Sequence, residues 1–487
     1  MRTVLAMAAA VVAQPVAAQV APVPAAADAW RQLTTADADA ALALITDNHP
    51  GAAAELDDRD FQAKLAAARA HVAERLPRVT GYAGYSAVMN GLANDFRDGH
   101  IWSRAILAQT RRSWAGLVVI RQAGAWIVGA QDEQSRDPDL DGARVTACDG
   151  MPVDRLAARR IGDFYGNPAI EADLASRAPL LLIDDANPFA PRAVTCSFAT
   201  VKGTTKTVTL NWRPISQSGL EAAIRPAMRA ARAGMGVAPF AGGYWIALGT
   251  LDDSAQAVVD AVEAQQAALR AAPMVVIDLR GNGGGNSGYA DAILTALVGK
   301  TRFDALPGMG QCSGAFWRAS PGNRAALQEF AAQQKAAGNT QGVAYFDSLD
   351  RDIATALQTK AEFAPALPPC ARRTAVAASK PVKLPPAAML GRLVVLTDRA
   401  CFSSCLIAVD RLRALGAEHV GEATNMSTRY MEVREITLPS GLRTFSTLQK
   451  VAVGLGDFGP YTPDRAYPGA MDDGDALKAW VAALPAR

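Results

Sequence analysis

The sequence has almost no net charge and no long apolar run. Its 49 Lys and Arg residues nearly balance its 47 Asp and Glu residues, which leaves a formal charge of +2 over 487 residues. This balance excludes a general attraction to nucleic acid or to an anionic membrane surface. Its apolar runs fall short of the roughly 20 residues that cross a bilayer, so the sequence predicts no membrane span.

The N-terminus has the features of an export signal. Arg2 precedes the apolar run VLAMAAAVVA (residues 4–13), and the small residues VAA (16–18) follow. A basic start, a short apolar stretch and a small-residue cleavage site are typical of a secretory signal peptide. We therefore expect residues 1–18 to be a signal peptide and the protein to be periplasmic or secreted. An uncleaved interfacial anchor is the alternative.

Histidine is scarce, and the six cysteines include no C-x-x-C pair. With only four His residues, the chain lacks a zinc-type ligand pattern, and we expect no metal or other cofactor. In an oxidising compartment some cysteines form disulfides. We expect Cys148 to pair with Cys196, because both lie in strand-like runs of one segment. Cys401 and Cys405 either brace the turn between them or are small buried residues. The remaining pairings are not settled by the sequence.

Sequence periodicity divides the chain into three regions. Ala-rich amphipathic segments with capping signals predict an N-terminal helical domain over residues 28–105. Alternating apolar and polar residues with Gly-rich turns predict a β domain over 114–212. Strands alternate with helices over 213–487, which indicates an α/β core. Residues 301–388 are rich in Gly and Pro, and we expect an irregular insertion there, with one helix (324–337), as a candidate lid.

The most unusual motif is VVIDLRGNGGGNSG, residues 275–288, in which a buried strand runs into a glycine-rich loop. Gly281, Gly283, Gly284 and Gly285 expose backbone N–H groups that can bind a phosphate or stabilise an oxyanion. The spacing does not fit a dinucleotide-binding fingerprint, and no Lys-Ser/Thr pair follows as in a P-loop. A tight strand-to-helix turn without chemistry is the simpler alternative.

A second motif, RACFSSCLIA (399–408), follows the apolar run LVVLT (393–397) and precedes a predicted helix. Such a strand–turn–helix junction can present a nucleophilic serine at the helix N-terminus, where the helix dipole stabilises developing negative charge. Ser403 and Ser404 both lie in the turn. The alternative is that Ser403 only caps the helix, which is the commonest role of Ser before a helix.

In this order the two motifs resemble those of the tail-specific (C-terminal processing) and tricorn-core family of serine peptidases. That family has a strand ending in D-L-R-x-N-x-G-G, matched by residues 278–285, and a serine turn and helix that lead to G-E-x-T, matched by Ser403 and residues 421–424. The resemblance spans most of the chain. It implies a crotonase-like (Clp protease-like) core sheet with helices, an N-terminal helical domain and a PDZ-like β domain.

The resemblance also implies roles for individual residues. Ser403 corresponds to the nucleophile of the family. The backbone amides of Gly284, Gly285 and Ser404 correspond to its oxyanion hole.

The general base differs between the branches of this family. The tail-specific branch uses a Lys shortly after G-E-x-T, but Ser427 stands at that position and no neighbouring Lys replaces it. The tricorn-like branch uses an upstream His, to which His100 in RDGHIW corresponds, although a single His is more often a packed or surface residue than a base. The orienting Glu of that branch corresponds to Asp457, and Gly99 replaces the Ser that precedes the His. The chain is therefore nearer the tricorn-like branch.

These patterns predict an exported serine peptidase that hydrolyses a peptide or protein substrate, with Ser403 as nucleophile and His100 as base. A non-catalytic peptide- or ligand-binding protein on the same fold is the main alternative, because the Lys is missing and Asp replaces Glu. An esterase is the third possibility, since the same groups attack both kinds of acyl carbon. The sequence predicts no nucleic-acid partner and leaves the oligomeric state open.

Overall fold

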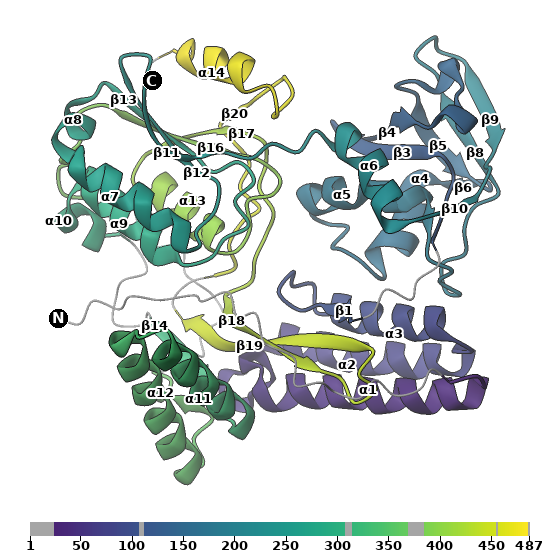
Figure 1. Cartoon of the computed structure of the whole chain (residues 1–487), viewed down its shortest axis with the longest axis horizontal. Coiled ribbons are helices and arrows are strands. Elements are labelled where there is room, and N and C mark those ends of the chain that lie inside the picture. Colours follow the sequence, from purple (N-terminus) through teal and green to yellow (C-terminus); the bar gives the residue numbers. More distant parts are fainter. Residues whose placement is uncertain (1–23, 107–111, 307–313, 369–383, 454–455, 486–487) are drawn as a thin grey trace.

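The computed structural model describes residues 24–106, 112–306, 314–368, 384–453 and 456–485. The chain is a mixed α/β structure with several separate sheets (Figure 1). The segment predicted to be a signal peptide, residues 1–18, lies outside the described residues. None of the helices in the described ranges is both long and apolar enough to cross a bilayer.

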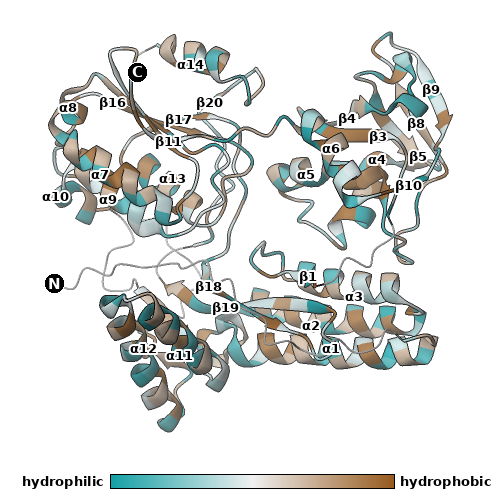
Figure 2. Ribbon diagram, viewed as in Figure 1, coloured by the Kyte–Doolittle hydropathy of each residue, from teal (hydrophilic) through white to brown (hydrophobic). Residues whose placement is uncertain are grey.

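A six-stranded sheet forms the centre of the α/β core. Its strands pair in parallel except for the edge strand β11, which is antiparallel to β12. The central strands are apolar runs such as MVVID, as expected for parallel strands covered on both faces, and Figure 2 shows them as mostly hydrophobic. In spatial order the strands are β11 (Met235–Phe240), β12 (Gly243–Leu248), β13 (Met274–Asp278), β16 (Arg392–Thr397), β17 (Glu418–Gly421) and β20 (Arg465–Ala466).

Helices cover both faces of this sheet (Figure 1). One face packs against five helices in a continuous apolar cluster, and the other packs against the C-terminal helix α14. The apolar stripe of each helix faces the sheet and its polar side faces solvent. The helices of the first face are α7 (Gln256–Ala264), α8 (Gln266–Ala271), α9 (Ser287–Val298), α10 (Lys300–Asp304) and α13 (Ser404–Ala414), and α14 spans Gly474–Ala482.

The two sequence motifs meet at one edge of this sheet. Strands β13 and β16 are parallel neighbours, with Asp278 paired in register with Leu396. Both strands therefore end at the same edge, where the loops that follow parallel strands lie side by side. The glycine-rich loop leaves the end of β13, and the Ser403 turn leaves the end of β16.

The N-terminal helices pack against a long β-hairpin from the C-terminal part of the chain. Helices α1 (Ala27–Asn48), α2 (Arg59–Arg75) and α3 (Tyr82–Asn94) share one apolar cluster with strands β18 (Tyr430–Thr437) and β19 (Arg443–Val453). Figure 1 shows the hairpin lying across these helices. Strand β19 also pairs with β18, β1 (Ser103–Ala105) and β14 (Gly314–Arg318), and β14 pairs with β15 (Phe363–Ala364).

The middle region is a separate β unit. Its main sheet contains β3 (Leu117–Gln122), β4 (Ala125–Gln131), β5 (Arg144–Cys148), β8 (Thr195–Ala199) and β9 (Thr205–Thr209), in that order. A smaller sheet contains β10 (Arg213–Ile215), β2 (Arg112–Trp114) and β7 (Ile183–Asp184). Cys148 and Cys196 are directly paired across β5 and β8 and form a disulfide, as the sequence predicts.

The segment 301–388 corrects one expectation. Its described part is a helical hairpin of α11 (Pro321–Ala336) and α12 (Thr340–Gln358), flanked by β14 and β15, where the sequence led us to expect an irregular insertion with one helix. The Ser320 and Asn339 side chains accept N–H bonds at the starts of the two helices, and an apolar cluster joins their inner faces. The apolar residues of α12 recur every three or four positions, at Val343, Phe346, Leu349, Ile353 and Ala356, so the helical period is present in the sequence and the Gly and Pro content of the whole segment was misleading. The proline-rich part, 369–383, and the cysteines Cys312 and Cys370 lie outside the described residues.

Candidate active site

Ser403 lies in a sharp turn between β16 and α13. Its backbone has φ 55° and ψ −127°, in the left-handed half of conformational space that residues with a Cβ avoid. Ser403 occupies the N-cap position of α13, yet its side chain makes no capping hydrogen bond. The hydroxyl is directed away from the helix, so the simple capping role considered from sequence does not describe this residue.

His100 faces this hydroxyl. It lies between α3 and β1, 303 residues before Ser403 in the chain, and its Nε2 atom is 3.0 Å from Ser403 Oγ. Ser446 on β19 donates a hydrogen bond of 2.8 Å to the backbone carbonyl of His100, which ties the base turn to the hairpin. The Phe402 ring lies 4.5 Å from the imidazole, centre to centre. Folding therefore brings the predicted nucleophile and base into direct contact.

Asp98 holds the other side of the imidazole. Its Oδ1 atom lies 2.9 Å from His100 Nδ1 and also accepts the backbone N–H of His100 at 2.9 Å, while its Oδ2 accepts the Thr428 hydroxyl. Burial alone raises the pKa of Asp98, but the charge of His100 and the bonds from His100 and Thr428 outweigh it and lower the pKa below its usual value. An ionised carboxylate only accepts hydrogen bonds, so Nδ1 carries the imidazole proton. Nε2 is then free to accept the Ser403 hydroxyl.

Asp457 lies near this group but binds elsewhere. Its Oδ1 accepts the backbone N–H of Arg429 at 3.0 Å, and among the described residues no hydrogen bond joins it to His100. Burial raises the pKa of Asp457, and the charge of Asp98 adds to this effect. The position next to Nδ1 that the resemblance implied for Asp457 is occupied by Asp98. The sequence signal for Asp98 was its spacing: an Asp two residues before a His in a turn can bond both the ring and the backbone N–H.

The glycine-rich loop packs against the nucleophile with no room for a side chain. A Cβ on Gly284 would lie 2.7 Å from the Ser403 Cβ, and the φ of 100° at Gly284 also favours glycine. The Gly284 N–H donates to Asn282 Oδ1 at 2.8 Å, so it is already used. The backbone N–H groups of Gly285 and Ser404 donate to no other described residue, and the Ser404 hydroxyl donates to the Gly285 carbonyl at 2.6 Å.

Two further links fix the nucleophile turn. Asp398 is buried and accepts the N–H groups of Gly281, at 3.0 Å, and Ala400, at 3.0 Å, so that one carboxylate ties the glycine loop to the serine turn. Burial raises its pKa to about 6. Cys401 and Cys405 are joined by a disulfide that brackets Ser403. The sequence left open whether these cysteines brace the turn or are only small buried residues, and the disulfide supports the first interpretation.

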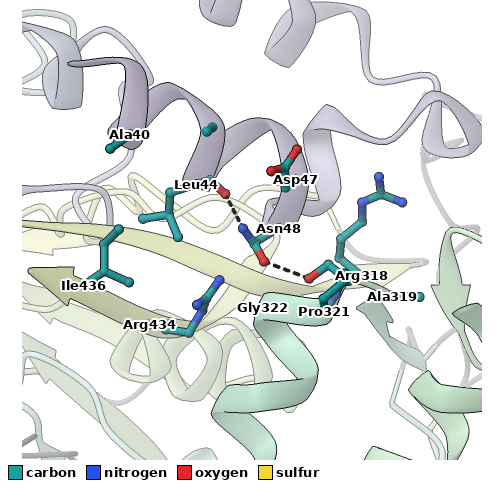
Figure 3. Close-up of a pocket in the computed structure, with 12 residues that line it drawn as sticks. Ala40, Leu44, Asp47, Asn48, Arg318, Ala319, Pro321, Gly322, Arg434 and Ile436 are labelled. Atoms are coloured by element: carbon teal, nitrogen blue, oxygen red, sulfur yellow. Dashed lines mark hydrogen bonds between the residues drawn. The ribbon is translucent and has the colours of Figure 1, made fainter. Parts of the chain in front are cut away.

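A separate cavity lies away from Ser403 and His100. The cavity has a volume of about 480 Å³ and opens between α1, β18 and the start of α11 (Figure 3). Inside it Ser320 Oγ donates to Asn48 Oδ1 at 2.7 Å. Neither Ser403 nor His100 lines this cavity. No cluster of three or more His, Cys, Asp or Glu side chains suited to a metal ion is found within the described ranges.

Comparison with known proteins places this geometry on a known fold. No protein-family model and no curated protein matches the sequence. Among solved structures, mature CPAF superposes with a TM-score of 0.59 at 15% identity, over 94% of this chain and 97% of that one. CPAF complexed with lactacystin gives a TM-score of 0.55 at 14% identity, over 93% and 98% of the two chains. A mutant of CPAF gives 0.58 at 14%, over 93% and 96%. The chain therefore shares the fold of CPAF over nearly its whole length.

Proposed function

We propose that the protein is a serine peptidase in which Ser403 is the nucleophile, His100 the general base and Asp98 the group that orients the imidazole. The observation that carries the proposal is the 3.0 Å contact between His100 Nε2 and Ser403 Oγ, with Asp98 on the opposite ring nitrogen. A serine hydroxyl bonded to an imidazole, which is in turn bonded to a carboxylate, is the arrangement that catalyses acyl transfer. The fold shared with CPAF adds independent support.

The reaction follows from the positions of the protons. Ser403 Oγ attacks the carbonyl carbon of the scissile bond while its proton passes to His100 Nε2, and Asp98 stabilises the imidazolium that forms. His100 then gives this proton to the leaving amine, and the acyl group stays on Ser403. A water molecule then attacks the acyl group on Ser403 while His100 accepts a proton from it. The proton returns to Ser403 Oγ as the carboxylic acid is released. No cofactor takes part in these steps.

The oxyanion of the tetrahedral intermediate needs donors beside Ser403. The N–H groups of Gly285 and Ser404 are the donors we assign, because neither is bonded within the described part of the chain and Ser404 lies at the positive end of the α13 dipole. Gly284 contributes space instead of a donor, because Asn282 holds its N–H. The sequence assigned the oxyanion hole to the amides of Gly284, Gly285 and Ser404. In this proposal only Gly285 and Ser404 donate, and Gly284 leaves room for the nucleophile.

The finer assignments of the fold are part of the same proposal. The six-stranded sheet with its helices fits a crotonase-like core, and the β unit over 114–212 fits a PDZ-like domain that binds a peptide or protein substrate. The N-terminal segment 1–18 supports export to the periplasm or beyond. The two disulfides within the described residues fit an oxidising compartment.

A fluorophosphonate probe tests the proposal directly. We expect wild-type protein to be labelled on Ser403 and to cleave an unstructured protein such as casein, and Ser403→Ala to abolish both. Ser218→Ala, which changes an exposed serine on α6 (Gln217–Met228), is the matched control and should behave as wild type. A folded wild type that neither reacts with the probe nor cleaves peptide or ester substrates would refute the proposal that the protein is an enzyme. The non-catalytic binding protein would then be the remaining interpretation. Turnover of esters without any peptide cleavage would indicate the esterase.

A further inference from the structure

We propose that the Cys401–Cys405 disulfide positions the nucleophile: it holds Ser403 in the backbone conformation that directs the hydroxyl to His100. The inference rests on the proposed function, because it assumes that Ser403 reacts. The two cysteines do not react themselves. Their cross-link is inferred to affect the rate of the reaction, which a merely structural cross-link would not do.

The backbone of Ser403 needs an external constraint. Its φ of 55° and ψ of −127° are sparsely populated by residues with a Cβ, and such conformations persist only where the surrounding structure enforces them. Glycine would adopt this backbone without strain but would bring no hydroxyl. A serine at this position therefore depends on its neighbours in the chain to stay in place.

The start of α13 also lacks its ordinary side-chain cap. A Ser at the N-cap usually accepts an N–H bond from the first turn, which stabilises the helix end. Here the Ser403 hydroxyl is directed to His100, and the Cys405 N–H donates instead to the Phe402 carbonyl at 3.1 Å. The disulfide joins Cys401, before the turn, to Cys405, the second residue of α13, so the cross-link spans the place where the cap is missing.

The turn is held from two sides. On one side it contacts the glycine-rich loop, where the Phe402 N–H donates to the Asn282 carbonyl at 3.3 Å and the Ser404 hydroxyl to the Gly285 carbonyl. On the other side both cysteines are fully buried in the apolar cluster beneath the sheet. With the cross-link removed, only hydrogen bonds and apolar packing would oppose relaxation of the strained residue.

The other disulfide among the described residues, Cys148–Cys196, is the example of a purely stabilising cross-link. Cys148 and Cys196 are 48 residues apart in sequence, whereas Cys401 and Cys405 are separated by 4. The stabilisation that a cross-link gives by restricting the unfolded chain grows with the length of the closed loop. The short link around Ser403 therefore gains least from this effect, and the local conformation of the turn is what it constrains.

The two disulfides provide a matched pair of variants. We expect Cys401→Ala with Cys405→Ala to lower the rate of fluorophosphonate labelling and the kcat for a peptide at least about tenfold, because the nucleophile leaves its strained position, with little change in KM. Cys148→Ala with Cys196→Ala should leave both rates near wild type and lower the melting temperature more. Labelling of the first variant at the wild-type rate would overturn the inference.

A second measurement covers a variant that does not fold. Wild-type protein is reduced stepwise with a phosphine, and mass spectrometry of peptides reports which disulfide has opened and whether Ser403 is labelled. The inference requires labelling to fall in molecules with the Cys401–Cys405 bond open, and equal labelling of open and closed molecules refutes it. A wild type that never reacts with the probe refutes the proposed function itself, so the two failures are distinguishable.

Discussion

The nucleophile and the base are held in two different ways by two different parts of the molecule. The Ser403 turn belongs to the six-stranded sheet, has a strained backbone, is closed by a disulfide and contacts a glycine loop without side chains. The His100 turn belongs to the segment after the N-terminal helices. It is held by a hydrogen bond from the ring to Asp98, by one from Ser446 to the His100 backbone carbonyl, and by the Phe402 ring. One half of the site is built by local constraint, and the other half by tertiary contacts.

This difference explains where the chemistry is sensitive. A nucleophile must sit at one point relative to the attacked carbon, so a rigid turn suits it. A base must also move a proton between two partners, so its tautomer and orientation matter as much as its place. Substitutions in the two halves should therefore fail for different reasons.

The largest effect is expected from removing either reacting group. Ser403→Ala and His100→Ala should each lower kcat/KM at least about 10⁴-fold, because nucleophile and base act as one unit. The double variant should be little worse than either single one. Steady-state kinetics with a peptide, beside circular dichroism to confirm folding, measures this. Independent, multiplying losses would show that the two residues do not work together.

The glycine loop tests the local half of the comparison. Gly284→Ala should reduce labelling and turnover to the level of Ser403→Ala, because the new Cβ meets the Ser403 Cβ at 2.7 Å and φ is 100°. Gly283→Ala is the matched control, since a Cβ there meets nothing within 4 Å. Similar losses in both variants would mean that the loop acts through its general flexibility and not through the space beside Ser403.

The orienting carboxylate tests the tertiary half. Asp98→Asn should lower kcat about 10²- to 10⁴-fold, because an amide can donate to Nδ1 and so favour the wrong tautomer of His100. Asp457→Asn should change kcat less than about tenfold, since Asp457 holds only the Arg429 backbone. The reverse order of the two effects would restore the assignment of Asp457 that the family resemblance implied.

The same pair predicts a dependence of stability on pH. The pKa of Asp98 is lowered in the folded protein, so its ionised form stabilises the fold above the ordinary carboxyl pKa, and this stabilisation is lost as the pH falls through the lowered value. The difference in melting temperature between wild type and Asp98→Asn should therefore stay constant from about pH 7 to about pH 5 and shrink as the pH falls below about 4. A difference that stays constant below about pH 4 would contradict an ionised Asp98.

The smallest effect is expected at Thr428, which donates to the second oxygen of Asp98. Thr428→Val keeps the shape of the side chain but removes the hydroxyl, and it should lower kcat about tenfold with KM unchanged. Thr428→Ser should recover most of the loss. A Val variant with wild-type kcat would show that His100 alone fixes Asp98.

Much of the nucleophile half could be predicted from the sequence. The strand VVIDLRG, its glycine loop and the strand before Ser403 are local patterns, and parallel strands that are neighbours place their loops at one edge. The Cys148–Cys196 pairing followed from two strand-like runs in one segment. Most of α11 was predicted as a helix over 324–337. Helix α12 was not predicted, because the segment was interpreted from its Gly and Pro content although the apolar residues of α12 recur every three or four positions.

The sequence by itself determined which side chains can react: a serine in a strand-to-helix turn, a glycine-rich loop after another strand, and His100 two residues after Asp98. Only the tertiary structure decided which of these groups meet. Asp98 and not Asp457 lies on His100 because the hairpin of β18 and β19 brings Thr428 and Ser446 to the base turn while Arg429 takes up Asp457. The contacts of Thr428 with Asp98 and of Ser446 with His100 join residues more than 300 positions apart, and hydrogen bonds over such separations leave no periodic trace in the chain.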